Sequence, residues 1–143
     1  ITADELIYDK IKNTFNAKGN SKAVNEKNTI TADELIYDKI KNTFNAKGNS
    51  KAVNEKNTIT ADELIYDKIK NTFNAKKNVE IIDLEKDAVI NSENISYIKE
   101  LEKIYSSGVT KILVEKKYDF QSSDVTFLRN RYFRIIFKTK NIN

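Results

Sequence analysis

The feature that most constrains this chain is a segment that occurs three times without change. The sequence ITADELIYDKIKNTFNAK stands at Ile1–Lys18, Ile30–Lys47 and Ile59–Lys76. In the first two copies it continues identically through GNSKAVNEKNT, so residues 1–58 are one unit of 29 residues written twice. Units of this length are typical of repeat architectures, in which each unit buries its apolar side against its neighbours. The sequence therefore predicts a repeat region at 1–58 and a second unit at 59–143, which begins with the third copy.

Each copy starts with residues that favour the beginning of an α-helix. Thr2 is a candidate N-cap, and Glu5 is placed to complete a capping box with it. Apolar residues then recur at every fourth position, at Ala3, Ile7, Ile11 and Phe15. This spacing predicts an amphipathic helix, and Gly19 is its expected end because glycine adopts the left-handed conformation without steric cost.

The apolar side of these helices is the predicted interaction face. The first copy is identical to the second, so it is not a specialised polar cap, and its exposed apolar side favours self-association. The residues of this face in the first two copies are Leu6, Ile7, Ile11, Phe15, Leu35, Ile36, Ile40 and Phe44. The expected partner is a second copy of the chain, giving a homo-oligomer, or another protein.

The third copy departs from the pattern at Lys77, which stands where the other copies have glycine. This position is the candidate boundary with the C-terminal unit. There, β-branched and alternating residues predict strands at 79–84, 109–118, 125–129 and 131–140, and a helix is expected at 92–105. The predicted fold class is α+β: N-terminal tandem helical repeats followed by a small antiparallel or mixed β-sheet packed by helices.

Composition excludes several classes of active site. The chain contains no Cys, His, Met, Trp or Pro. It therefore has no disulfide, no thiol nucleophile and no Ser-His-Asp triad, and it lacks the commonest transition-metal ligand. No apolar run approaches the roughly 20 residues of a membrane-spanning helix, so no membrane partner is expected. No cofactor is predicted.

Two short motifs indicate metal chemistry. Glu115 and Lys117 at the end of an apolar strand resemble the (D/E)-x-K core of metal-dependent nucleases, with Asp83 or Asp87 as the further carboxylate. The spacing Asp83-x-Glu85-x-Asp87 also matches the first ligands of an EF-hand loop, but Ala88 stands at the position of the required glycine. We interpret both as solvated charged segments, so the chain is expected not to be an enzyme and to have no metal site.

The last segment concentrates positive charge among aromatic residues. No acid follows Asp124, and all three arginines of the chain lie beyond it. A basic strand with exposed aromatics suits phosphate contact and base stacking. The residues of this alternative nucleic-acid site are Arg129, Arg131, Tyr132, Arg134, Lys138 and Lys140.

The favoured hypothesis is a non-enzymatic interaction or assembly protein that uses its repeated helices, in the cytoplasm. The alternative is a nucleic-acid-binding protein that uses the basic C-terminal strand, and metal-dependent nuclease activity is a minor alternative.

Overall fold

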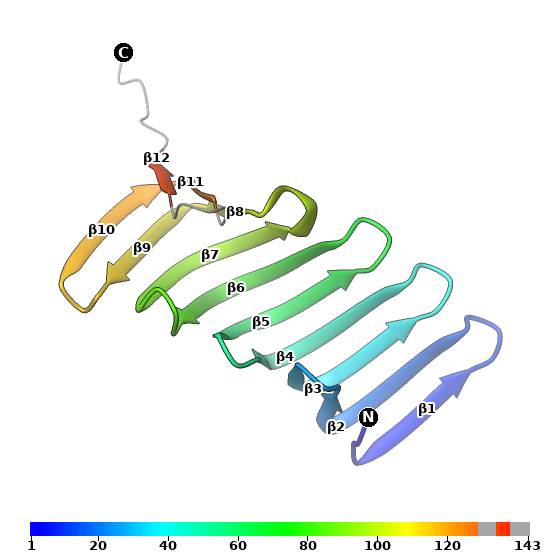
Figure 1. Cartoon of the computed structure of the whole chain (residues 1–143). Helices are drawn as coiled ribbons and strands as arrows, with labels where there is room; N and C mark the ends of the chain where they lie inside the picture. The colour runs from blue at the N-terminus through cyan, green and yellow to red at the C-terminus, as the bar shows by residue number, and fades with distance from the viewer. Residues whose placement is uncertain (129–133, 138–143) are drawn as a thin grey trace.

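The structure is a computed structural model that describes residues 1–128 and, as backbone, residues 134–137. In this part of the chain there is no α-helix, and the strands form one antiparallel sheet (Figure 1). The strands are β1 (Glu5–Asp9), β2 (Thr14–Val24), β3 (Thr29–Asp38), β4 (Thr43–Val53), β5 (Asn57–Asp67), β6 (Thr72–Asp83), β7 (Ala88–Ile98), β8 (Lys103–Ser107), β9 (Val109–Val114), β10 (Tyr118–Ser123), β11 (Val125–Leu128) and β12 (Arg134–Phe137). A 3₁₀ turn, η1 (Lys99–Leu101), joins β7 to β8. The predicted α+β class is therefore wrong.

The order of the strands is almost the order of the chain. Each strand from β1 to β8 pairs with the next, and β8 then pairs with β11, which pairs with β12. The sheet divides at β7: its residues 94–98 pair with β8, whereas its residues 88–91 pair with β9, the partner of β10. The two ends of β7 thus lead into two separate extensions of the sheet.

Each repeat forms two strands joined by a tight turn. In the second copy, the Oδ1 atom of Asp38 accepts hydrogen bonds from the backbone amides of Ile40 and Lys41, at 2.9 Å each. Asn42 follows in the left-handed conformation, with φ of 57°. An Asp that accepts from the amides two and three residues ahead is an Asx turn, and Asn tolerates positive φ better than most residues. The segment DKIKN is therefore a hairpin turn and not the middle of a helix.

The long strands bend at their centres. Gly48 and Asn49 of β4 both have positive φ, 76° and 46°. In the register with β5 these two residues lie opposite the single residue Asp62, which makes a β-bulge, and the register with β3 shifts at the same place. A bulge of this kind bends its strand and increases the local twist. The same bend recurs at residues 19–20 of β2 and 77–78 of β6. Because the bends are aligned across neighbouring strands, they fold the whole sheet along one line.

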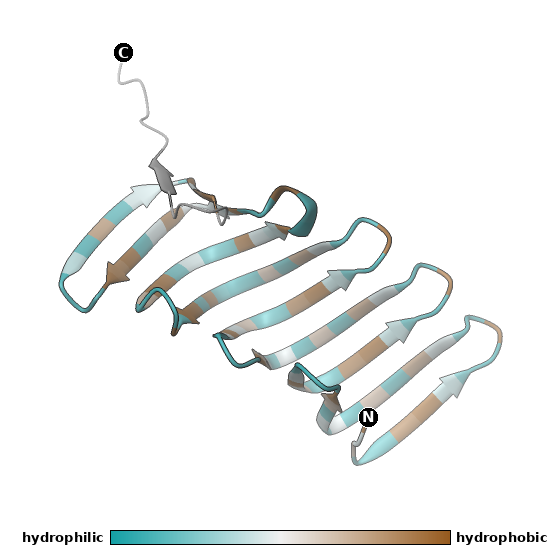
Figure 2. Cartoon of the chain, in the orientation of Figure 1, coloured by the Kyte–Doolittle hydropathy of each residue, from teal (hydrophilic) through white to brown (hydrophobic). Residues whose placement is uncertain are grey.

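Folding along this line turns one face of the sheet inward. The buried core takes small and aliphatic residues from both sides of the bend, among them Ala32, Leu35, Ala46 and Val79. At the bend the hydroxyl of buried Ser50 donates to the carbonyl oxygen of Ala46 at 2.8 Å, which satisfies both polar groups where the regular ladder is broken. The apolar strips of β1, β3 and β5 recur at the same place along the sheet (Figure 2).

The residues that predicted a helix start have other roles. Thr2 forms an isolated bridge with Lys22, with both backbone hydrogen bonds at 2.8 Å, and Glu5 is the first residue of β1. Gly19 does adopt positive φ, but it does so at a strand bend and not at a helix end. Residue 58, at the predicted division of the chain, lies within β5, which pairs with both β4 and β6.

In the C-terminal unit, the strands predicted at 109–118 and 125–129 are confirmed over Val109–Val114 and Val125–Leu128. The strand predicted at 79–84 is the second half of β6. The helix predicted at 92–105 is wrong, because this range contains the end of β7, η1 and the start of β8. The described residues contain no helix that is long and apolar enough to cross a membrane.

Candidate functional site

The described structure contains a groove of about 550 Å³ between the two halves of the bent sheet. Its volume lies in the range of small-molecule sites, and most of the side chains along its walls are apolar. The residues that line the groove come from both sides of the bend and belong to strands β2 to β8 and β11. Its walls therefore belong to the repeats and to the C-terminal unit together.

One wall of the groove is aromatic. Inward-facing Tyr and Phe residues lie next to each other on successive strands because they occupy paired positions in the sheet, as in the pairs of Tyr66 with Phe44 and with Phe73. Phe73 in turn pairs with Tyr97 of β7. At the N-terminal end the ladder continues along a second hollow of about 440 Å³, where the rings of Tyr8 and Phe15 stack with centroids 4.5 Å apart.

The opposite wall is aliphatic. Ala52 lies between Ile30 and Ile59, and Ile81 pairs with both Ile59 and Ile90. All five of these side chains line the groove. Buried Ile104 and Phe127 from β8 and β11 line it at its C-terminal end. The result is an apolar channel that runs across the strands, with a flat aromatic wall and a branched aliphatic wall.

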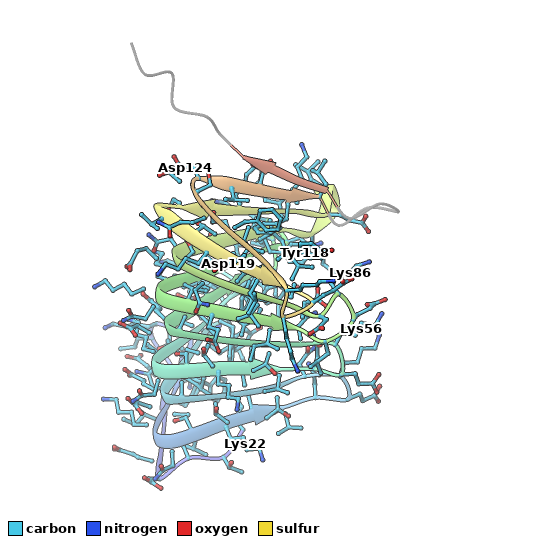
Figure 3. All side chains as sticks on the ribbon, turned by 90° about the vertical axis from the view of Figure 1, so that its left-hand side faces the viewer. Lys22, Lys56, Lys86, Tyr118, Asp119 and Asp124 are labelled. Atoms are coloured by element: carbon cyan, nitrogen blue, oxygen red, sulfur yellow. The ribbon has the colours of Figure 1, made fainter. Side chains whose placement is uncertain are left out.

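The two rims of the groove differ in charge. On the aliphatic side the polar residues that line the groove include Asn25, Asn54 and Asp83. The Lys56 side chain on this rim forms an ion pair with Glu85 at 3.6 Å, and Lys56 and Lys86 lie on neighbouring turns of the same side (Figure 3). On the aromatic side the rim carries Lys68 and Lys99.

The predicted interaction face is distributed over three places. Ile11, with 94% of its side chain exposed, and Ile40 stand at turn tips. Phe15, Leu35 and Phe44 face inward, and Leu35 is 1% exposed. The remaining members, Leu6, Ile7 and Ile36, are strand residues beside them. Because the residues form strands, a spacing of four does not place them on one side.

The aromatic ladder was missed by the sequence interpretation. Its members in the repeats, Tyr8, Phe15, Tyr37, Phe44, Tyr66 and Phe73, are separated alternately by 7 and 22 residues. This regular alternation is the signal that was present. It indicates paired positions on either side of a four-residue turn, but it has meaning only once the repeat is taken as a hairpin.

The residues of the predicted nuclease motif lie at a turn. Glu115 has φ of 54°, and its amide donates to the carbonyl oxygen of Asp87 at 2.7 Å. The Oδ1 atom of Asp83 accepts from the amides of Glu85 and Lys86, so this carboxylate stabilises its own turn. In the described part of the chain, no group of three or more acidic residues is arranged to hold a metal ion.

The alternative nucleic-acid site falls largely outside the described residues, which exclude Arg129, Arg131, Tyr132, Lys138 and Lys140. Arg134 is described only as the first backbone position of β12, paired with Leu128.

A comparison with known structures finds a similar fold. The chain resembles LptH from Pseudomonas aeruginosa, described as the LptA-homologous periplasmic component of the conserved lipopolysaccharide transport device. The TM-score is 0.62 at 10% sequence identity, over 97% of this chain and 92% of that one. No protein-family model matches the chain, and no curated protein matches it.

The all-β fold removes the basis of the favoured functional hypothesis. The assembly hypothesis required amphipathic helices, which the described chain does not form, and the likeness gives no support to nucleic-acid binding. The expected cytoplasmic location conflicts with it, because the similar protein is periplasmic. That protein is described as a component of a transport device.

Proposed function

We propose that this protein holds the acyl chains of a lipid amphiphile in its groove and takes part in lipopolysaccharide transport. The observation that carries the proposal is the apolar groove between the two halves of the bent sheet, with its aromatic and aliphatic walls. The resemblance to LptH supports the same ligand class and a periplasmic location. Other proteins of a transport device are the partners that this proposal implies.

The walls suit a hydrocarbon chain better than a compact polar ligand. The groove runs across the strands, so a chain lying in it contacts one aromatic and one aliphatic side chain at each strand pair. Removing a methylene group from water contributes about 0.8 kcal/mol, so about ten methylene groups supply about 8 kcal/mol before the ordering costs of binding. Polar headgroups remain at the rims, where lysine and amide side chains are available.

A groove-filling substitution tests the proposal. Ala52 lines the aliphatic wall and is half-buried, so Ala52→Trp places an indole in the channel. The neighbouring Lys51 is exposed on the other face of β4, and Lys51→Trp is the matched control. Displacement of a groove-bound fluorescent fatty acid by lipopolysaccharide measures binding.

The expected result is binding by the wild type and by Lys51→Trp, and at least tenfold weaker binding by Ala52→Trp. Equal binding by the two tryptophan variants would mean that the ligand lies elsewhere. Absence of binding by the wild type would reject the proposal.

A further inference from the structure

Three lysines occupy the same place in successive turns along the aromatic rim. The backbone amides of Lys39, Lys68 and Lys99 donate to carbonyl oxygens of the preceding turn, at 3.1, 3.0 and 3.2 Å. The acceptors are Asn13, Asn42 and Asn71. Each step crosses two strands, which corresponds to about 10 Å. Lys99 belongs to η1, whose sequence is not part of the repeat, so the position is occupied by lysine in two unrelated turn sequences.

The side chains of two of these lysines, Lys39 and Lys68, lie over the aromatic wall. The Lys39 Nζ atom is 5.0 Å from the ring centroid of Phe15 and 5.8 Å from that of Tyr8. The Lys68 Nζ atom is 5.0 Å from the ring centroid of Tyr37. An ammonium group over an aromatic face is attracted by the ring quadrupole. Because Lys68 and Lys99 also line the groove, the amino groups are held at its edge.

The ammonium groups of Lys39, Lys68 and Lys99 are available to a negatively charged ligand. Within the described residues, none of these three lysines forms an ion pair. The acids next to these lysines in the chain are Asp38, Asp67 and Glu100. One carboxylate oxygen of each aspartate already accepts two backbone amides. The opposite rim differs, because its Lys56 is paired with Glu85. Within the described residues a lysine–acid ion pair thus lies on the opposite side, and the three lysines of the aromatic rim have none.

We propose that Lys39, Lys68 and Lys99 bind the phosphate groups of the amphiphile whose acyl chains fill the groove. This inference rests on the proposed function and adds the chemistry of the headgroup and its direction in the groove. A lysine binds phosphate as a point charge, and hydrogen bonds between ionised partners are about twice as strong as neutral ones. Equivalent lysines at steps of about 10 Å give a phosphate the same contact at successive places along the groove.

Two ligands with the same chain and different headgroups test this inference. Decyl phosphate and decyl glucoside, both below their micelle concentrations, are compared in displacing a groove-bound fluorescent fatty acid at low salt. The variant K39Q/K68Q/K99Q removes the rim lysines. The control K12Q/K41Q/K70Q removes three exposed lysines from the repeat turns, none of which lines the groove. Inorganic phosphate is a third competitor and represents a free-phosphate source.

The wild type and the control variant are expected to prefer decyl phosphate about tenfold, and K39Q/K68Q/K99Q about twofold or less, with glucoside binding unchanged. Inorganic phosphate is expected not to compete at the same concentration. Competition by inorganic phosphate, an equal loss in the control, or no preference in the wild type would overturn the inference while leaving the groove proposal intact. If neither decyl ligand displaces the probe, the proposed function fails and this inference with it.

Discussion

The amide nitrogen Nδ2 of Asn49 donates to the Oδ2 atom of Asp33 at 3.1 Å, across the line along which the sheet bends. The same bond joins Asn20 to Asp4 at 3.0 Å. Beneath it, a Cβ atom added to Gly48 would collide with the Asp33 carboxylate. At this position of the second copy, glycine is favoured for two reasons: the positive φ and the space that the aspartate occupies.

Two substitutions at the bends are expected to change the stability of the protein in opposite directions. Gly48→Ala forces alanine into positive φ against Asp33, and we expect a loss of about 1–3 kcal/mol in the free energy of unfolding. Lys77 has φ of 63° at the corresponding place in the third copy. Lys77→Gly removes that strain and should raise the free energy of unfolding by about 0.5–1 kcal/mol. The greater conformational entropy of glycine in the unfolded chain reduces this gain. Urea unfolding measures both; destabilisation by Lys77→Gly would contradict the account.

The collision at Gly48 also predicts coupling between two positions. Asp33→Ala removes the two atoms nearest to the new Cβ, Oδ2 and Cγ, and leaves only the Asp33 Cβ at 3.1 Å. The double variant Asp33→Ala/Gly48→Ala should therefore be more stable than the sum of the single changes. For residues in direct contact, coupling of about 0.5–3 kcal/mol is typical. A double-mutant cycle in urea measures this energy. Strict additivity would show that backbone strain alone accounts for the cost.

Two members of the predicted interaction face should respond very differently to mutation. Leu35 is buried at the floor of the bent sheet, so Leu35→Ala should cost about 2–5 kcal/mol. Ile40 stands at a turn tip, with 68% of its side chain exposed, so Ile40→Ser should change the stability by less than about 0.5 kcal/mol. Thermal or urea unfolding distinguishes these results. Comparable losses at the two positions would indicate that they share one packed surface.

The sequence allowed the repeat length, the left-handed conformation of Gly19 and two C-terminal strands to be predicted, but not the strands of the repeat. Thr2 and Glu5 match a capping box, and Ala3, Ile7 and Ile11 match a helical spacing, because both patterns are short and compatible with a bent hairpin. In the folded chain, pairing between strands outweighs the local preference for helix, because the stability of a strand depends on the residues of the neighbouring strands. The groove was not predictable for the same reason: its walls meet only after strands far apart in the chain have paired.

Removing one repeat tests whether the strands act as a stack. Deletion of residues 1–29 leaves a chain that begins with the identical second copy and retains every later strand pair. We expect it to fold with a β-sheet circular dichroism spectrum. Its urea m-value should be lower by roughly a fifth, in proportion to the surface lost. A helical spectrum, or loss of cooperative unfolding, would contradict the fold described above.

The most direct test of the central claim is photocrosslinking of lipopolysaccharide from the two faces of one strand. A benzoylphenylalanine in place of Phe44 lies on the aromatic wall of the groove, and one in place of Lys51 lies on the outer face of β4. The account predicts a lipopolysaccharide adduct from position 44 and none above background from position 51. No adduct from position 44, or equal adducts from both positions in folded protein, would contradict the claim that the groove holds the acyl chains.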